Sequence, residues 1–287
     1  MIETKNLSYQ YGTGTPFEKE AVRGVSVRVE TGELVGIIGH TGSGKSTLIQ
    51  MLNGLMKPTS GQVLLDGRDI WAEPKKIREI RFRVGMVFQY PEYQLFEETV
   101  LKDIMFGPGN MGLSEEQAQA RAREAAEFTG LKPELLDKSP FELSGGEKRR
   151  AAIAGVIAMD PEVLILDEPT AGLDPRGRDV ILTQIQAYHK QRGNTILFVS
   201  HSMEDVARMA DRILVMNHGE AALFDTTQEV FSQAPVLEQA GLRVPQITKI
   251  MRYLHDEQNL PVDKSTLTVD AALRQLLPIL QRGGKRS

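Results

Sequence analysis

The 287-residue sequence contains no cysteine and no long uninterrupted apolar run. The absence of cysteine excludes disulfide bonds and zinc–thiolate sites, and it is consistent with a reducing environment. The longest apolar stretches, such as residues 151–159, are far shorter than the ~20 residues needed to span a bilayer, so we expect any membrane role to be peripheral. The N-terminal residues also lack the apolar segment of a signal peptide.

The sequence also has no excess of basic over acidic residues. The formal net charge is −4, with 34 Lys and Arg against 38 Asp and Glu, which argues against nucleic acid as the main partner. No fixed-period repeat or low-complexity tract is visible. The composition, with 41% hydrophobic and 25% charged residues, is that of a globular protein, and the length allows one large domain or a domain with an appendage.

The strongest signal that is present is Gly-His-Thr-Gly-Ser-Gly-Lys-Ser at 39–46, between an apolar run at 34–38 and an amphipathic stretch at 47–56. Because it lies between a predicted strand and a predicted helix, the pattern predicts a phosphate-binding loop. The alternative is a Gly-rich turn that contains Gly-Lys-Ser by chance, and such a turn would not need a strand before it and a helix after it. Glycines let backbone N–H groups point at the phosphates, and the helix N-terminus adds a partial charge of about +0.5. Lys45 is expected to reach the β- and γ-phosphates, and the Ser46 hydroxyl to ligate Mg²⁺. The nucleotide-binding residues predicted here are Gly39, His40, Thr41, Gly42, Ser43, Gly44, Lys45, Ser46 and Thr47.

The remaining pattern predicts an α/β fold with a mainly parallel sheet covered by helices on both faces. The first 30 residues are expected to form an antiparallel β region, because apolar residues alternate there. Residues 114–130 are rich in Glu, Gln, Ala and Arg, and Ser114 with Gln117 predicts a capping box. We therefore expect a helical insertion at about 91–150. Further strands are expected at 61–66, 84–88, 163–166, 195–199 and 213–216, with a hairpin turn at 218–219.

The C-terminal segment differs in character from the rest. Ile247, Ile250, Met251 and Leu254 have the spacing of an amphipathic helix, and a second such pattern begins at Val269. We expect a core domain at 1–230 and a small helical appendage at 231–287. These helices either cover the core or form a dimerisation surface, and the sequence leaves both readings open.

Two carboxylates, Asp167 and Glu168, end the apolar run at 163–166. In a phosphate-loop enzyme the first carboxylate is expected near Mg²⁺, and the second is free to accept a proton from an attacking water. Alone, such a pair is equally consistent with capping of the next helix. The phosphate loop upstream favours the nucleotide reading.

The segment Leu143-Ser-Gly-Gly-Glu147 is a second Ser-Gly-Gly turn that opens a helix, and it predicts a second anion site at Ser144, Gly145 and Gly146. One nucleotide has one γ-phosphate, which the first loop already holds. Two such sites on one chain are therefore explained if two chains meet head to tail, each nucleotide lying between the first loop of one subunit and this turn of the other.

Taken together, these motifs resemble the ATP-binding cassette family over about residues 2–230. The family's order is kept: the phosphate loop, Gln89, the signature at 143–147, Asp167-Glu168, the segment at 171–174 and His201. The resemblance implies a P-loop NTPase fold of this type that binds ATP and Mg²⁺ and hydrolyses the nucleotide. One departure is Glu147, where the commonest signature has glutamine. We expect this change to be tolerated, because Ser144 and the backbone donors remain.

The resemblance also implies roles for residues that carry no signal alone. Tyr11 looks like the aromatic residue that stacks on adenine, although a half-buried strand tyrosine is the alternative. Gln89 is similar to the loop glutamine that touches Mg²⁺ and the attacking water and senses the transport partner. His201 resembles the switch histidine that contacts the γ-phosphate. The implied catalytic residues are Glu168, His201 and Gln89, and the implied metal ligands are Ser46, Gln89 and Asp167.

Other polar residues are interpreted without a role in catalysis. The histidines at 40, 189, 218 and 255 are read as surface or loop residues. The basic run Lys148-Arg149-Arg150 is read as a solvated helix face rather than an anion patch.

Several segments resemble the energy-coupling factor transporters of prokaryotes, which take up vitamins and metal ions. These segments are 88–100, 102–108, 148–155, 174–178, 229–231 and 241–245. Residues 90–96 are similar to the second of the two paralogous ATPase subunits. The resemblance implies a peripheral subunit on the cytoplasmic side of the cell membrane, with three partners: a second ATPase subunit, a transmembrane coupling protein and a substrate-binding membrane protein.

A docking surface is predicted just after Gln89. Tyr90, Pro91, Leu95 and Phe96 lie beside the acids Glu97 and Glu98. The cluster either fills the boundary with the helical insertion or receives a cytoplasmic helix of the coupling protein.

Three other functions are alternatives to an energy-coupling factor ATPase. The chain could serve a conventional cassette importer, act as a soluble cassette protein on ribosomes or DNA, or bind nucleotide as a regulator without turnover. The single cassette without basic arms argues against the second, and the presence of Glu168 and His201 argues against the third.

Overall fold

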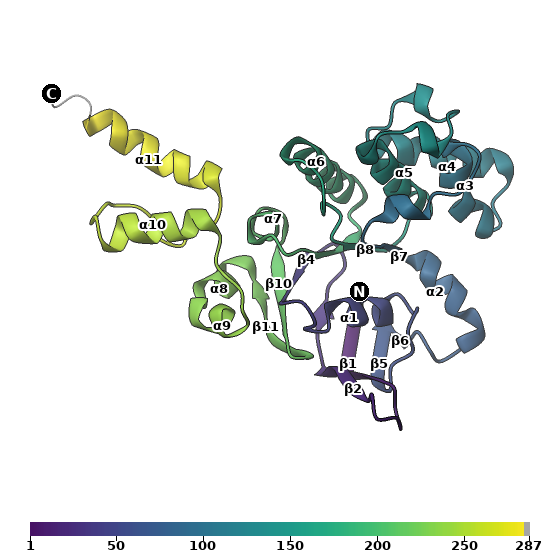
Figure 1. Cartoon of the computed structure of the whole chain (residues 1–287), viewed down its shortest axis with the longest axis horizontal. Coiled ribbons are helices and arrows are strands. Elements are labelled where there is room, and N and C mark those ends of the chain that lie inside the picture. The colour runs from purple at the N-terminus through teal and green to yellow at the C-terminus, as the bar shows by residue number, and fades with distance from the viewer. Residues whose placement is uncertain (284–287) are drawn as a thin grey trace.

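A computed structural model describes residues 1–283 and shows two β-sheets with helices packed around them (Figure 1). The first sheet has the strand order β2-β1-β5-β6, with β3 paired to β1, and all of its pairs are antiparallel. This confirms the antiparallel N-terminal region. Its strands are β1 (Ile2–Tyr11), β2 (Lys19–Val25), β3 (Arg28–Val29), β5 (Ser60–Leu65) and β6 (Arg68–Asp69).

The second sheet has the order β11-β10-β4-β9-β8-β7. Neighbours from β10 to β7 are parallel, and only the hairpin of β10 and β11 is antiparallel among the described residues. The mainly parallel sheet is thus confirmed, and its inner strands are continuous apolar runs because both faces are covered. Its strands are β4 (Leu34–Ile38), β7 (Val84–Val87), β8 (Val163–Asp167), β9 (Thr195–Val199), β10 (Arg212–Asn217) and β11 (Glu220–Thr226).

Alternate residues of the parallel strands enter two different hydrophobic cores. On β4, Val35 and Ile37 pack toward α1 (Lys45–Leu52) and the antiparallel sheet. Leu34 and Ile38 pack on the opposite face. That face is covered by α3 (Val100–Asn110), α5 (Gly145–Ile157), α6 (Pro175–Arg192) and α7 (Met203–Met209).

The helical insertion contains α3, α4 (Glu115–Phe128) and α5, and it lies at one end of the molecule (Figure 1). The predicted capping box is present: the Ser114 hydroxyl accepts from the Gln117 amide, and the Gln117 side chain accepts from the Ser114 amide. A further helix, α2 (Ile77–Arg83), precedes β7. Helix α1 ends at Leu52, earlier than the expected 47–56, because Gly54 adopts φ +74° and turns the chain out of the helix.

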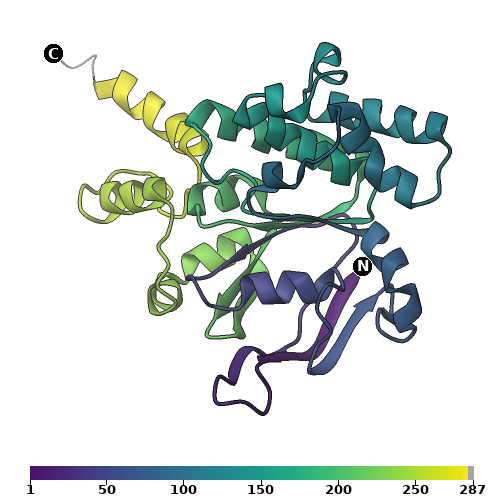
Figure 2. The same ribbon diagram turned by 45° about the vertical axis from the view of Figure 1, so that its right-hand side comes forward.

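The C-terminal helices divide between two cores. Helices α8 (Thr227–Ser232) and α9 (Ala234–Gln239) bury Phe231 and Leu237 in the large core. Helices α10 (Gln246–Asp256) and α11 (Val269–Gly283) share a small separate cluster around Met251. Helix α11 projects from the molecule at the end opposite the helical insertion (Figure 2). Its apolar residues Val269, Leu273, Leu277 and Leu280 are exposed, so these positions do not cover the core.

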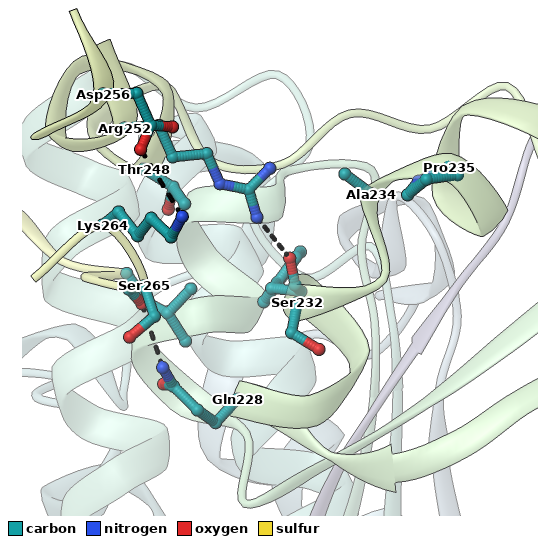
Figure 3. A pocket seen from close by; sticks show the side chains of 11 residues that line it. Gln228, Ser232, Ala234, Pro235, Thr248, Arg252, Asp256, Lys264 and Ser265 are labelled. Carbon is teal, nitrogen blue, oxygen red and sulfur yellow. Dashed lines mark hydrogen bonds and ion pairs between the residues drawn. The ribbon is translucent and has the colours of Figure 1, made fainter.

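A cavity of about 480 Å³ separates α8 and α9 from α10 (Figure 3). Polar contacts cross it. Arg252 of α10 donates to the Phe231 carbonyl at 3.2 Å, and Gln228 of α8 donates to the Ser265 carbonyl at 3.1 Å. These bonds tie the last two helices to the preceding part of the chain. No helix within residues 1–283 is long and apolar enough to cross a membrane.

Candidate functional site

Four predicted functional segments follow the carboxyl ends of neighbouring parallel strands. Residues 39–46 follow β4, His201 follows β9, the carboxylates Asp167-Glu168 end β8, and Gln89 follows β7. Because β4, β9, β8 and β7 are adjacent in this order, the segments form a row along one edge of the sheet. This edge is where open α/β sheets bind ligands.

Two glycines of the loop at 39–46 are required by close packing. A Cβ on Gly39 would lie 2.4 Å from the Met216 carbonyl oxygen, and a Cβ on Gly44 would lie 2.4 Å from the Ala21 carbonyl oxygen. Gly44 also has φ +100°, a left-handed conformation that side chains disfavour. Lys45 Nζ donates to the carbonyls of Gly39 and His40 at 2.7 and 3.0 Å, so the buried lysine is held across its own loop.

The loop leads into the N-terminus of α1 with Gly44 at the N-cap and no side-chain cap there. The first backbone N–H groups of a helix have no intrahelical partner, and here no side chain takes their place. The buried Ser43 hydroxyl also has no hydrogen-bond partner within the described residues. These free donors fit a phosphate group.

A cavity of about 170 Å³ borders this helix start and includes the predicted aromatic residue Tyr11. The Tyr11 hydroxyl lies 3.1 Å from Thr47 Oγ1, and the ring packs edge-on against Tyr9. The Tyr11 side chain is still 42% exposed. The structure therefore brings Tyr11 and the phosphate loop to one cavity while leaving part of the ring free.

The two carboxylates at the end of β8 are buried, with 9% of each residue exposed. Burial raises the pKa of Asp167, and the charge of Lys45 opposes that shift. Burial also raises the pKa of Glu168, to about 7. Glu168 Oε1 has no hydrogen-bond partner within residues 1–283. The Glu168 backbone adopts φ 49°, an uncommon conformation for a residue other than glycine.

His201 faces these carboxylates. Its Nε2 lies 3.4 Å from Glu168 Oε1, and its side chain is 54% exposed. Burial and the charge of Lys45 lower the pKa of His201 below its ordinary value, which favours a neutral imidazole beside Glu168. Gln89 is exposed at the next position along the sheet edge. Oxygen atoms of Ser46, Asp167 and Gln89 are the kind of ligand that Mg²⁺ prefers.

At the signature turn, residues 144–147, a side chain caps the helix start, unlike at the phosphate loop. The Ser144 hydroxyl donates to Glu147 Oε2 at 2.6 Å, and the Ser144 amide donates to the same oxygen at 2.9 Å. These bonds lower the pKa of Glu147. In the described structure the turn does not line the cavity at the phosphate loop, and α5 lies apart from α1 (Figure 1). The expected contact of Ser144, Gly145 and Gly146 with nucleotide on a second chain stays a prediction.

A groove of about 390 Å³ lies near the predicted docking cluster, between the segment after Gln89 and helices α3 and α5. Phe96 lines it and packs edge-on against Phe106, with ring centroids 5.0 Å apart. Pro91 is buried and does not contribute to this surface. Of the two acids, Glu98 pairs with Lys102 at 2.6 Å, whereas the backbone amide of Glu97 is held by Asp103.

The basic run at 148–150 was predicted to be a solvated face, and for Arg149 this is wrong. Only 2% of Arg149 is exposed, because its guanidinium pairs with Glu92 and bonds to the carbonyls of Pro169 and Ala171. Sequence reasoning missed both Glu92 and Arg149, since no local pattern links residues 57 positions apart.

Comparisons with known proteins agree with this geometry. The family profile described as "ABC transporter" matches residues 22–171. The chain is 54% identical to the energy-coupling factor transporter ATP-binding protein EcfA2 of Clostridium acetobutylicum, over 98% of both chains. The solved structure of cbiO1 from Clostridium perfringens, part of the ABC transporter complex cbiONQ, has TM-score 0.74 and 40% identity, covering 88% of this chain and 98% of that one. A dimeric ATP-binding cassette bound to ADP and Pi has TM-score 0.71 and 29% identity, covering 79% of this chain and 99% of that one.

Proposed function

The chain belongs to the ABC transporter family, among the energy-coupling factor ATP-binding proteins, and we propose that it powers an importer by binding and hydrolysing ATP. The observation that carries this proposal is the row formed by residues 39–46, His201, Asp167-Glu168 and Gln89 along one sheet edge. Such a row offers donors for phosphate, oxygen ligands and a free carboxylate within one site.

We propose a role for each of these residues. The loop amides and Lys45 hold the β- and γ-phosphates, and Tyr11 stacks on the base. Ser46, Asp167 and Gln89 would hold Mg²⁺, which would neutralise phosphate charge. Glu168 accepts a proton from the attacking water, which its Oε1 is free to do because it has no hydrogen-bond partner within residues 1–283. His201, neutral and exposed beside Glu168, contacts the γ-phosphate.

We propose that the site is completed by a second ATPase subunit, with a paralogue as the favoured partner. The signature turn lies apart from the chain's own phosphate loop, so it is available to nucleotide on another chain. A similar cassette whose solved structure is dimeric supports a pair of ATPase subunits, and we propose that the two subunits meet head to tail. The division into a cassette at 1–230 and an appendage from 231 onward also stays a proposal.

The proposed transport partners are a transmembrane coupling protein and a substrate-binding membrane protein, which would place this subunit at the cytoplasmic face of the cell membrane. The names of the energy-coupling factor relatives support this assignment. The groove beside Phe96 and Glu97 is the proposed docking surface. A vitamin or a metal ion is the proposed class of cargo, and other polypeptides would select it.

The test is purification of the chain from membranes with identification of every polypeptide that accompanies it, followed by measurement of Mg²⁺-dependent phosphate release. A coupling protein with a separate substrate-binding protein is the expected result. Two membrane domains of a conventional importer would favour the alternative, and absence of phosphate release from the assembled complex would contradict the ATPase assignment.

A further inference from the structure

Arg149 is a buried cation at the junction of three segments. It lies on α5 with 2% of its surface exposed. A guanidinium stays charged at any pH that a protein tolerates, so its burial requires partners for its N–H groups. The structure supplies those partners from two loops that are far apart in the sequence.

One side of the guanidinium faces the segment after Gln89. Arg149 Nε donates to Glu92 Oε2 at 3.0 Å and Nη2 donates to Glu92 Oε1 at 2.6 Å, a two-bond pairing with fixed geometry. The guanidinium carbon also lies 5.7 Å from the Tyr90 ring centroid. Glu92 belongs to the short 3-10 helix Pro91–Gln94, which leads directly into the groove at Leu95 and Phe96.

The other side faces the loop that follows Glu168. Arg149 Nη1 donates to the Pro169 carbonyl at 3.3 Å and also to the Ala171 carbonyl. These two carbonyls are one and three residues beyond the proposed general base. A single planar group thus bonds at the same time to the docking segment and to the catalytic loop.

Both loops contain a residue in the left-handed backbone region. Tyr90 has φ 55° and Glu168 has φ 49°. Such conformations in residues other than glycine persist where the surrounding structure holds them, and they cluster at functional sites. Arg149 contacts the Tyr90 ring and the carbonyl of the residue after Glu168, so it is placed to stabilise both conformations.

We propose that Arg149, through Glu92, is a positioning residue that makes residues 90–94 and residues 168–171 move as one unit. Displacement of the docking segment would then displace the backbone that carries Glu168, without any contact between Arg149 and nucleotide. This inference rests on the proposed function, because it gives the segment a docking role and Glu168 a catalytic one.

A second ion pair holds the same catalytic loop from another direction and offers a way to loosen that loop while the Arg149–Glu92 pair stays intact. Arg178 Nε donates to both carboxylate oxygens of Asp205 at 2.9 Å, and the Thr170 hydroxyl donates to Asp205 Oδ2 at 3.4 Å. Asp205 belongs to α7, which starts just after His201. This pair supports residues 168–171 but makes no bond to residues 90–94 within the described structure.

The test compares Glu92→Gln with Asp205→Asn in the full-length chain by hydrogen exchange. Glu92→Gln keeps the side-chain shape and one acceptor but removes the charge that pairs with Arg149. We expect faster exchange in both 88–96 and 168–174. Asp205→Asn keeps the Arg149–Glu92 pair, so the faster exchange that it causes in 168–174 and 200–206 should extend to 88–96. In the Glu92→Gln background, Asp205→Asn should leave 88–96 unaffected. Arg149→Lys keeps the positive charge but loses the planar guanidinium that bonds to both loops. It gives a second variant if Glu92→Gln does not fold.

Kinetics of the assembled ATPase pair supply the second readout. Glu92→Gln should lower kcat by about 10–100-fold with KM for ATP unchanged, since small displacements of a catalytic group cost about that much and the phosphate loop is untouched. Arg149→Lys, which cannot bond to both loops at once, should lower kcat at least as much as Glu92→Gln.

The link between the two loops and the proposed ATPase function are tested by different outcomes. Wild-type exchange in 168–174 for Glu92→Gln, with faster exchange confined to 88–96, would show that the two loops are independent and would overturn the role of Arg149. Absence of ATP hydrolysis by the wild-type complex would instead overturn the proposed function, and the exchange data would still decide whether the loops are linked.

Discussion

Nε2 of His201 and Oε1 of Glu168 lie 3.4 Å apart, at the ends of two adjacent parallel strands. The carboxylate oxygen in this contact is buried and makes no hydrogen bond within residues 1–283, and the lowered pKa of His201 favours a neutral ring. The pair is therefore a poor structural salt bridge. It is better explained by the proposed roles of Glu168 as the general base and of His201 as the contact to the γ-phosphate.

Hydrolysis should depend on pH through Glu168. Burial raises the pKa of this carboxyl to about 7. The proposed base must be ionised, so kcat/KM for ATP should rise as pH increases through about 7 and level off above it. The measurement is kcat/KM from about pH 5.5 to about 8.5, with protein stability checked at each pH. A flat profile over this range would argue against a base with this pKa.

Gly146→Asp should block the proposed shared site. The substitution would place a carboxylate against the γ-phosphate of the opposite chain, where like charges repel. The glycine lies in open space, with Arg150 Nη1 as the near neighbour at 3.7 Å of an added Cβ, so the subunit should still fold.

Activity of the Gly146→Asp pair should fall, while the isolated subunit still binds nucleotide through its own phosphate loop. Binding is measured with a fluorescent ATP analogue. Loss of binding by the folded, isolated variant would show that the site is completed within one chain.

Glu147→Gln should favour closure of the ATPase pair. In the present structure Glu147 accepts both the hydroxyl and the amide of Ser144, and its charge would lie near the phosphate in a head-to-tail pair. Glutamine can still complete the capping box but carries no charge. ATP-dependent dimer formation, measured by gel filtration with Glu168→Gln in both proteins, should increase by a few-fold. Weaker dimerisation would mean that the carboxylate contributes to closure.

Reversing the charge of Glu97 and Glu98 in the docking segment should disrupt assembly with the transmembrane coupling protein. Glu97→Arg with Glu98→Arg changes the charge beside the groove at Phe96, and a basic partner residue would then be repelled. The control is Glu134→Arg with Asp137→Arg, which makes the same charge change at exposed positions elsewhere in the helical insertion.

Both variants should fold and bind ATP. Only the first should lose co-purification of the coupling protein from detergent extracts and substrate uptake in reconstituted vesicles. Assembly and uptake at the wild-type level in Glu97→Arg with Glu98→Arg would remove these acids from the interface.

Much of the site could be predicted from sequence because its signals are local. The spacing from Gly39 to Ser46, the apolar run before Asp167 and the Ser114–Gln117 capping box each depend on neighbouring residues. In the folded chain, β4, β9, β8 and β7 are neighbours, so the functional segments that follow them lie along the carboxyl-terminal edge of the sheet. Family resemblance, rather than local pattern, was needed for Gln89 and His201.

The parts that could not be predicted depend on distant partners. The sequence Lys148-Arg149-Arg150 looks like a solvated face, and Arg149 is buried because Glu92 and two carbonyls from another loop surround it. The split of the C-terminal helices between two cores is similar, since Leu237 and Met251 have the same apolar character but different neighbours.

The central claim is that Glu168 is the general base of an ATPase. The direct test is phosphate release by the assembled complex with Glu168→Gln, because this change keeps the size of the side chain and leaves the contacts of Lys45 with the phosphate loop intact. We predict that ATP binding is retained and that hydrolysis falls by about 10²–10⁴-fold. Hydrolysis at the wild-type rate in that complex would contradict the account.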